Sequence, residues 1–221
     1  MSFLKPKFWD ENKISLLAIL LFPITLLIQL LIFFKTRLTK NNNCSIPIIC
    51  VGNIYLGGTG KTPLCVEIFL ILKKLNMNPA FVRSKHDSFQ DEANLQKQFG
   101  QVYQNKNRVK AVKEAIKNKA NIVILDDGFQ DFSINKNLSI VCFNKKQWIG
   151  NGLTIPSGPL RENLSGLKRA NCAFINGDKN SDIENKIFSK NREIKIFYFN
   201  YKPKNIGEFH NKKIVDFAGI G

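Results

Sequence analysis

A glycine-rich stretch that ends in lysine and threonine is where the residue types of this sequence point most directly to chemistry. It reads VGNIYLGGTGKTP over residues 51–63. In a phosphate-binding loop, glycines let main-chain N–H groups approach phosphate oxygens, the lysine reaches the β- and γ-phosphates, and the threonine hydroxyl binds Mg²⁺. The matching residues are Gly57, Gly58, Thr59, Gly60, Lys61 and Thr62. Tyr55 replaces the first glycine of the strict motif, so a glycine-rich turn with an ordinary lysine is the alternative interpretation.

Acidic residues form a second candidate group. In NIVILDDGFQ, residues 121–130, four aliphatic residues run into Asp126 and Asp127. A buried strand ending there would bring carboxylates to the phosphate loop, where they can hold Mg²⁺; a plain turn at a strand end is the alternative. A kinase also needs a carboxylate near the acceptor hydroxyl, and Asp91 and Glu92 begin a predicted helix over 91–99. Acidic residues at a helix N-terminus are also common for structural reasons.

Arg108 and Arg161 are candidates for binding phosphate charge, because a guanidinium group can bind two oxygens at once. Arg161 lies in GNGLTIPSGPLREN, residues 150–163, where many turn-forming residues predict a long ordered loop. In so basic a chain, a solvated surface arginine is the alternative for either residue.

The elements around these residues predict an α/β fold, a P-loop NTPase-like parallel sheet flanked by helices. Aliphatic runs typical of buried strands alternate with helical patterns, which favours parallel strands with right-handed crossovers. Apolar residues recur at helical spacing over 64–75, and a second amphipathic helix is predicted over 106–119. We expect strands at 46–52, 79–82, 122–126, 138–143, 171–175, 194–200 and 213–218.

An apolar membrane-anchor helix is expected ahead of this sheet. Residues 14–34 carry no charge, and about 21 residues at ~1.5 Å each can cross a hydrocarbon core of ~30 Å. Lysines and arginines flank both ends, so charge does not fix an orientation, and the helix can either span the bilayer or lie in one leaflet. A buried core helix is the alternative. The polar residues 39–45 are expected to link this segment to the folded domain.

Composition and net charge indicate which classes of binding partner to expect. The chain has 221 residues, 44% hydrophobic and 23% charged, which is typical of a globular domain with an appendage. Its net charge of +16 favours phosphate-bearing partners such as nucleotides and lipid headgroups, although biased genomic base composition explains part of such an excess. We find no nucleic-acid recognition motif and expect no nucleic-acid partner, and no obligate protein partner is indicated. Five scattered cysteines favour a reducing compartment and no zinc site.

Several phrases in this chain resemble the tetraacyldisaccharide 4′-kinase family of lipid A biosynthesis. The resemblance rests on VGNIYLGGTGKTP, NRVKAV, IVILDDGFQ, GNGLTIPSGPLREN and the closing DFAGIG, in the order of the family, and it covers the chain from the apolar segment onward. It implies a bacterial inner-membrane enzyme with its catalytic domain on the cytoplasmic side. With ATP and Mg²⁺, such an enzyme phosphorylates the 4′-hydroxyl of an acylated disaccharide phosphate lipid, a tetraacyl glucosamine disaccharide 1-phosphate.

The resemblance also implies a role for each candidate residue. We expect Asp91, Lys61 and Asp127 to be catalytic. The expected nucleotide-binding residues are Gly57, Gly58, Thr59, Gly60, Lys61, Thr62, Arg108, Arg161 and Gln130. The expected Mg²⁺ ligands are Thr62, Asp126, Asp127 and Glu92.

Two departures from the family pattern modify this expectation. Asp131 stands where the family usually has a histidine, and the chain ends at AGIG, where relatives continue to a histidine that pairs with the catalytic carboxylate. We therefore expect an anchor over residues 1–40 and a kinase domain over 41–221 that includes the start of a truncated C-terminal subdomain. The alternative function is a membrane-tethered nucleotide-binding remnant without kinase activity.

Overall fold

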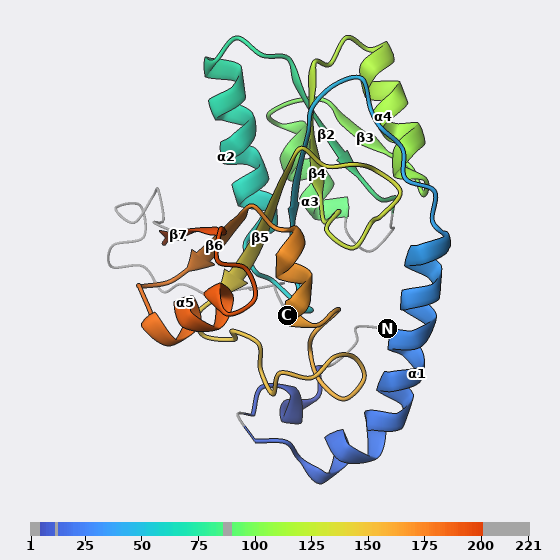
Figure 1. Ribbon diagram of the computed structural model, residues 1–221. Helices are drawn as coiled ribbons and strands as arrows, with labels where there is room; N and C mark the ends of the chain where they lie inside the picture. Colours follow the sequence, from blue (N-terminus) through green and yellow to red (C-terminus); the bar gives the residue numbers. More distant parts are fainter. Residues whose placement is uncertain (1–4, 12, 86–89, 201–221) are drawn as a thin grey trace.

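A seven-stranded parallel sheet organises the computed structural model, which describes residues 5–11, 13–85 and 90–200. The strand order is β3-β2-β4-β1-β5-β6-β7 (Figure 1). The strands are β1 Ile48–Gly52, β2 Pro79–Arg83, β3 Val102–Gln104, β4 Ile122–Asp126, β5 Leu138–Asn144, β6 Cys172–Asn176 and β7 Lys195–Phe199. The helices are α1 Leu16–Leu38, α2 Lys61–Lys74, α3 Gln90–Lys97, α4 Arg108–Lys117 and α5 Ser181–Phe188, with 3₁₀ turns at Lys7–Trp9 and Leu164–Arg169.

The predicted α/β class is confirmed, and six of the predicted strands form within about two residues of the expected bounds. The seventh, at 213–218, lies outside the described residues. β4 shows why these runs become strands: all five of its residues are buried, and its four aliphatic residues alternate between two hydrophobic cores. Val123 and Leu125 face one core, while Ile122 and Ile124 face the other. A strand covered on both faces needs apolar residues at every position.

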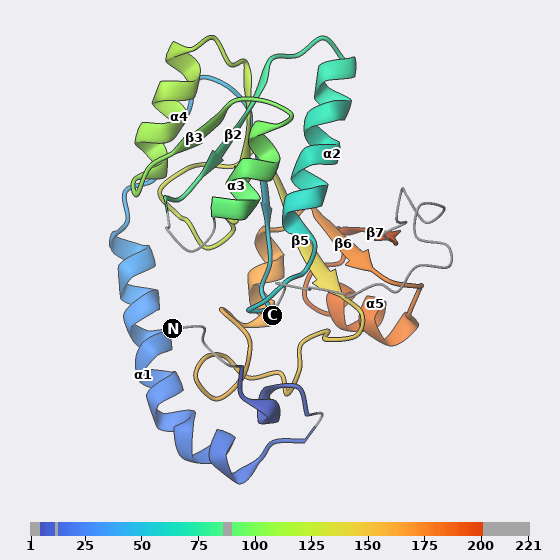
Figure 2. The same ribbon diagram turned by 180° about the vertical axis from the view of Figure 1, so that it is seen from behind.

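Helices cover both faces of the sheet, as Figures 1 and 2 show from opposite sides. α2 packs on one face through Cys65, Val66, Phe69 and Leu72. α4 and α5 supply Ala111, Val112, Ala115, Ile183 and Ile187 to the core on the other face. This layered arrangement leaves the carboxyl ends of the strands free of covering helices, so the loops that follow β1, β4 and β5 meet at one edge.

The strand order places the glycine-rich loop next to the acidic pair. β1 lies between β4 and β5, and Val51 is in register with Asp126. The chain leaves β1 after Gly52 and reaches α2 at Lys61, so the intervening loop emerges beside the end of β4. Parallel neighbours therefore bring together two segments that lie far apart in the sequence.

The apolar N-terminal segment forms α1, which runs along one side of the domain (Figures 1 and 2). Among the described residues α1 is the one helix long and apolar enough to cross a membrane, and most of its surface is exposed. Pro23 lies within the helix without ending it. Only Ala18 and Thr25 of α1 are buried.

Thr25 fixes α1 to the loop over residues 150–163. Its hydroxyl donates to Ser157 Oγ at 2.8 Å and accepts from the Ser157 N–H at 3.1 Å. A buried hydroxyl in an apolar helix requires such partners, because leaving it unpaired would cost free energy. α1 is therefore docked on the same loop that carries Arg161.

Both flanks of α1 also contact the sheet domain. Before the helix, Trp9 is buried; its indole N–H donates to the Pro156 carbonyl at 3.0 Å, and its own carbonyl accepts from Asn151 N–H at 2.9 Å. After the helix, the Asn42 N–H donates to the Ser133 carbonyl at 2.9 Å. The 39–45 segment, which we expected to be a linker, thus contacts the domain directly.

Candidate active site

The loop between β1 and α2 has the backbone shape of a phosphate-binding loop. Gly57 and Gly60 have φ values of 145° and 83°, which glycine adopts more readily than other residues. Gly60 is the N-cap of α2, and Lys61 and Thr62 form the first turn of this helix. Unpaired N–H groups at a helix start favour anions. Thr59 is buried, and its hydroxyl has no hydrogen-bond partner among the described residues.

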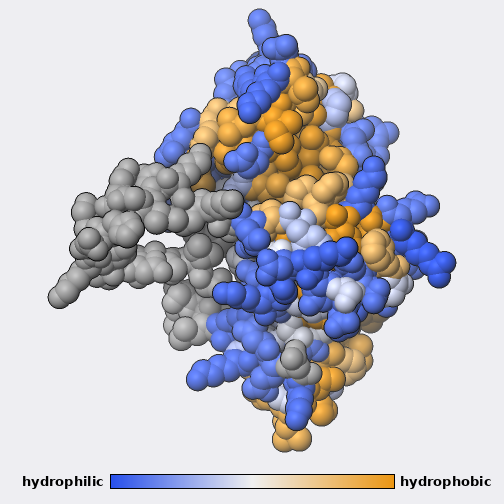
Figure 3. Space-filling view, turned by 90° about the vertical axis from the view of Figure 1, so that its left-hand side faces the viewer, coloured by the Kyte–Doolittle hydropathy of each residue, from blue (hydrophilic) through white to orange (hydrophobic). Residues whose placement is uncertain are grey.

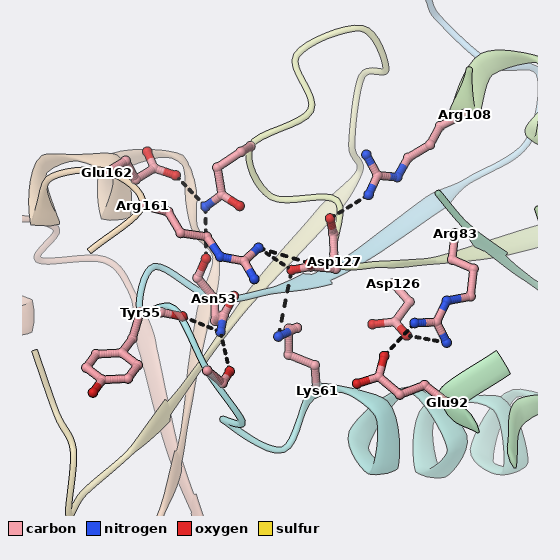
Figure 4. A network of polar contacts seen from close by, with 12 residues as sticks. Asn53, Tyr55, Lys61, Arg83, Glu92, Arg108, Asp126, Asp127, Arg161 and Glu162 are labelled. Carbon is pink, nitrogen blue, oxygen red and sulfur yellow. Dashed lines mark hydrogen bonds and ion pairs between the residues drawn. The ribbon is translucent and has the colours of Figure 1, made fainter. Parts of the chain in front are cut away.

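Asn53 holds this loop from inside. Its side-chain amide donates to the carbonyl oxygens of Tyr55 at 2.5 Å and Gly57 at 3.1 Å (Figure 4). Both carbonyl oxygens therefore accept hydrogen bonds from within the loop. The side chain of Gln130 in turn donates to the Asn53 carbonyl at 2.8 Å. A fully buried asparagine with these contacts fixes the loop shape at the point where the usual first glycine is missing.

Asp127 lies at the centre of the basic residues in Figure 4. Lys61 Nζ is 3.7 Å from Asp127 Oδ1, and Arg161 Nη1 donates to both carboxylate oxygens at 2.8 and 2.9 Å. Arg108 Nη2 donates to the Asp127 carbonyl at 2.8 Å. Burial alone would raise the pKa of Asp127, but Lys61, Arg161 and Arg108 together hold it below its ordinary value. An ionised carboxylate thus neutralises the cations that a triphosphate would meet.

Asp126 has a different environment from its neighbour. It is 1% exposed, and Oδ2 accepts a hydrogen bond from the Gln96 side-chain amide at 2.9 Å. Burial raises the pKa of this carboxyl, opposed by the Arg83 guanidinium 3.7 Å away and reinforced by Asp127. Asp126 Oδ1 is buried without a hydrogen-bond partner among the described residues.

The donor set fits a Mg²⁺ ion bound together with phosphate oxygens. The unpartnered Asp126 oxygen, the Asp127 carboxylate and the Thr62 hydroxyl all lie at the ends of neighbouring elements, β4 and α2. Mg²⁺ in phosphoryl-transfer sites typically takes one or two carboxylates, waters and substrate phosphates, so a complete protein cage is not needed. In the part of the chain that the structure describes, no cluster of three or more acidic, histidine or cysteine ligands occurs.

The two acidic residues of α3 lie at the side of this group. Glu92 accepts from Arg83 Nη2 at 2.5 Å, so its carboxylate is engaged by a guanidinium in the structure. Asp91, next to it in the first turn of α3, is exposed. Glu92 could serve as a metal ligand only after leaving Arg83, and its expected role, like that of Asp91, stays a prediction.

The loop over residues 150–163 also borders the candidate site. Its backbone pairs with the phosphate loop, since Leu56 N–H donates to the Pro159 carbonyl at 2.8 Å and Arg161 N–H donates to the Ile54 carbonyl at 2.7 Å. Glu162 accepts from Gln130 Nε2 at 2.8 Å. These contacts explain how an arginine on a long loop reaches Asp127.

The structure therefore gathers most of the predicted residues at one edge. Lys61, Arg161 and Arg108 contact Asp127, which follows Asp126, while Gln130 contacts the glycine-rich loop through the Asn53 carbonyl. Asp131, at the position of the family histidine, pairs with Arg108 at 3.2 Å. Sequence reasoning did not identify Asn53, Arg83, Gln96 or Glu162 as parts of this site. The adjacency of Asn53 to a strand end and of Glu162 to Arg161 were the available signals.

Comparison with known proteins identifies a matching family. The model of the tetraacyldisaccharide-1-P 4′-kinase family matches residues 17–221. A tetraacyldisaccharide 4′-kinase of Pelagibacter ubique is 43% identical over 224 residues, covering all of this chain and 71% of the relative. The corresponding protein of Rhodopseudomonas palustris is 27% identical, covering 98% of this chain and 69% of the relative.

A solved structure has the same fold. The "apo" form LpxK of Aquifex aeolicus, crystallised in complex with ATP, superposes with a TM-score of 0.62 at 20% identity. The superposition covers 91% of this chain and 86% of that one. At this identity the likeness supports the fold, which agrees with the sheet and loop described above.

Proposed function

Since this chain belongs to the tetraacyldisaccharide-1-P 4′-kinase family, a family of phosphotransferases, we propose that it transfers the γ-phosphoryl group of ATP to the 4′-hydroxyl of a tetraacyl glucosamine disaccharide 1-phosphate. Such a transfer is a step of lipid A biosynthesis. The observation that carries the proposal is the placement of Lys61 and Arg161 around Asp127, at the mouth of a glycine-rich loop.

Different residues bind the nucleotide and accept the proton in this phosphoryl transfer. Loop amides and Lys61 bind the β- and γ-phosphates, and Arg161 and Arg108 move from Asp127 to the phosphate oxygens once ATP is bound. Thr62, Asp126 and Asp127 would hold Mg²⁺, which when bound neutralises charge on the phosphates. The glycine-rich loop over residues 57–60 lets the backbone approach the triphosphate closely.

The phosphoryl transfer requires one proton acceptor. The 4′-hydroxyl oxygen forms a bond to the γ-phosphorus, the bond from that phosphorus to the bridging oxygen breaks, and ADP leaves with the bonding pair. The hydroxyl proton passes to a carboxylate, a role we assign to Asp91. Its exposed position in the first turn of α3 leaves it accessible to an acceptor.

The direct test supplies ATP labelled with ³²P on its γ-phosphate, together with the acceptor lipid in detergent micelles. We expect a new labelled lipid with Mg²⁺ present. We expect none with the metal chelated by EDTA, because the negative charges of Asp126 and Asp127 would then repel the triphosphate. Phosphatase treatment and product mass identify the 4′-phosphate. Binding of ATP without any labelled lipid would overturn the proposal in favour of a nucleotide-binding remnant.

We also propose that the enzyme binds the cytoplasmic face of the bacterial inner membrane with α1 in one leaflet. The helix carries exposed apolar side chains along its length, among them Leu20, Leu27 and Leu31. Yet contacts before α1, within it and after it all reach the same domain: Trp9 with Pro156, Thr25 with Ser157, and Asn42 with Ser133. A helix that spanned the bilayer would have its two ends on opposite sides, so these contacts favour a monotopic arrangement.

Cysteine labelling tests that arrangement. Lys13→Cys and Lys40→Cys place thiols at exposed positions on either side of α1. In inverted inner-membrane vesicles, an impermeant maleimide is expected to label both, and in right-side-out vesicles neither. The unsubstituted chain measures the background of its own cysteines. Labelling of the two positions from opposite sides would instead show a spanning helix.

A further inference from the structure

Tyr55, the residue in place of the first loop glycine, is tied to the segment that precedes α1. It is fully buried, and its phenol O–H donates to Asp10 Oδ1 at 2.6 Å. A phenol is protonated at neutral pH and can donate; burial, and then the bond to Asp10, raise the pKa of Tyr55 further above its ordinary value. Lys5 contacts the same hydroxyl, lies 2.5 Å from Asp10 Oδ1, and stands over the tyrosine ring.

Asp10 is itself held by contacts independent of Tyr55. It follows the 3₁₀ turn Lys7–Trp9, and its N–H donates to the Lys7 carbonyl at 3.1 Å. The neighbouring Trp9 is 2% exposed and forms hydrogen bonds with Pro156 and Asn151. The carboxylate is therefore presented to Tyr55 from an anchored turn rather than from a loose terminus.

Tyr55 is thus fixed at two points. Asn53 holds its carbonyl oxygen from inside the loop, while Asp10 holds its side chain from the N-terminal segment. A residue with a side chain has fewer backbone conformations available than glycine. These two bonds, together with the pairing of Ile54 and Leu56 with the 150–163 loop, hold the backbone just ahead of Gly57. The loop amides beyond it depend on that conformation for their direction.

We propose that Asp10 is a positioning residue that acts through Tyr55 to set the phosphate-binding loop in its ATP-binding conformation, so that the N-terminal segment carrying the membrane helix also supports nucleotide affinity. The inference rests on the proposed function to the extent that this loop binds ATP. It concerns affinity for the nucleotide, since neither Asp10 nor Tyr55 contacts Asp91 or the described basic residues around Asp127.

The experiment measures ATP affinity by calorimetry, with the steady-state KM for ATP and for the lipid, on the full chain. Asp10→Ala and Tyr55→Phe each remove the bond, and we expect about tenfold weaker ATP binding, the usual scale of a hydrogen bond to a charged group. The KM for ATP should rise by a similar factor, while the KM for the lipid and kcat stay near wild type. Asp10→Asn keeps an oxygen acceptor and should restore affinity to within about threefold. The double variant should bind no more weakly than either single one.

Glu11→Ala is the matched control, because it removes an exposed carboxylate at the next position. Wild-type ATP affinity in both Asp10→Ala and Tyr55→Phe would overturn the inference. So would equal losses for ATP and lipid together with a lower Tm, which would indicate a general structural role. Failure of the proposed kinase activity has a different signature: the unsubstituted chain would then bind ATP but produce no labelled lipid, and the ATP affinities of the variants would still test this inference.

Discussion

Lys61→Ala is expected to weaken ATP binding roughly 10–100-fold, on the scale of a charge-assisted hydrogen bond to phosphate, and to lower turnover by about 10²–10³-fold. Lys61 starts α2, and its ammonium group lies 3.7 Å from Asp127, at the point where the loop presents its amides. In the bound state it would move from the carboxylate to the phosphates. Arg161 and Arg108 remain on Asp127 in the variant, so we expect the fold to be retained.

Isothermal titration with ATP and the labelled-lipid assay measure these two quantities separately. Lys74→Ala is the matched control, because this lysine lies on the same helix, in its last turn, and is exposed. If Lys61→Ala bound ATP and phosphorylated lipid like the wild type, the loop would not be the phosphate site. A lower Tm in Lys61→Ala but not in Lys74→Ala would show that folding, rather than binding, had changed.

Asp91→Asn is expected to lower turnover by roughly 10²–10⁴-fold while leaving ATP affinity unchanged, the usual range for loss of a general base. The helix that carries it is fixed to the ends of β4 and β2 by one side-chain contact each. Gln96 donates to Asp126, and Glu92 binds Arg83, which itself approaches Asp126. These contacts fix the helix whose first turn carries Asp91, and the amide replacement keeps the shape of that side chain but cannot accept the proton.

Single-turnover measurements with saturating ATP isolate this step from binding. Asp182→Asn is a suitable control, since Asp182 is also exposed and also lies in the first turn of a short helix, α5. Loss of both ATP affinity and turnover in Asp91→Asn would assign Asp91 to the metal site instead. Unchanged turnover would remove it from the mechanism.

Local sequence patterns determined much of the fold. Runs of aliphatic residues long enough for a strand and too short for a helix predicted β1, β2 and β4 to β7, and the uncharged stretch over 14–34 predicted α1. β3 and α5 were not predicted. β3 has only three residues, and α5 is a short polar helix with few apolar positions, so neither carries a periodic signal over enough residues.

Part of the candidate site was also predictable from local sequence. Lys61 and Thr62 follow from a contiguous motif, and Asp126 and Asp127 from their place at the end of an aliphatic run, because loop and strand-end chemistry is encoded within a few consecutive residues. Asp91, Glu92, Arg108 and Arg161 were candidates by residue type, and the family resemblance gave them roles and added Gln130. Identity and site location were thus largely present in the sequence.

Only the tertiary structure decided which of these groups touch. Asn53 under the loop, Gln96 and Arg83 beside Asp126, Arg161 on Asp127, and Asp10 against Tyr55 join residues from different elements. Such contacts depend on strand order, on the course of the 150–163 loop and on where α1 docks. Those features are set by the packing of the whole domain, and no stretch of consecutive residues specifies them.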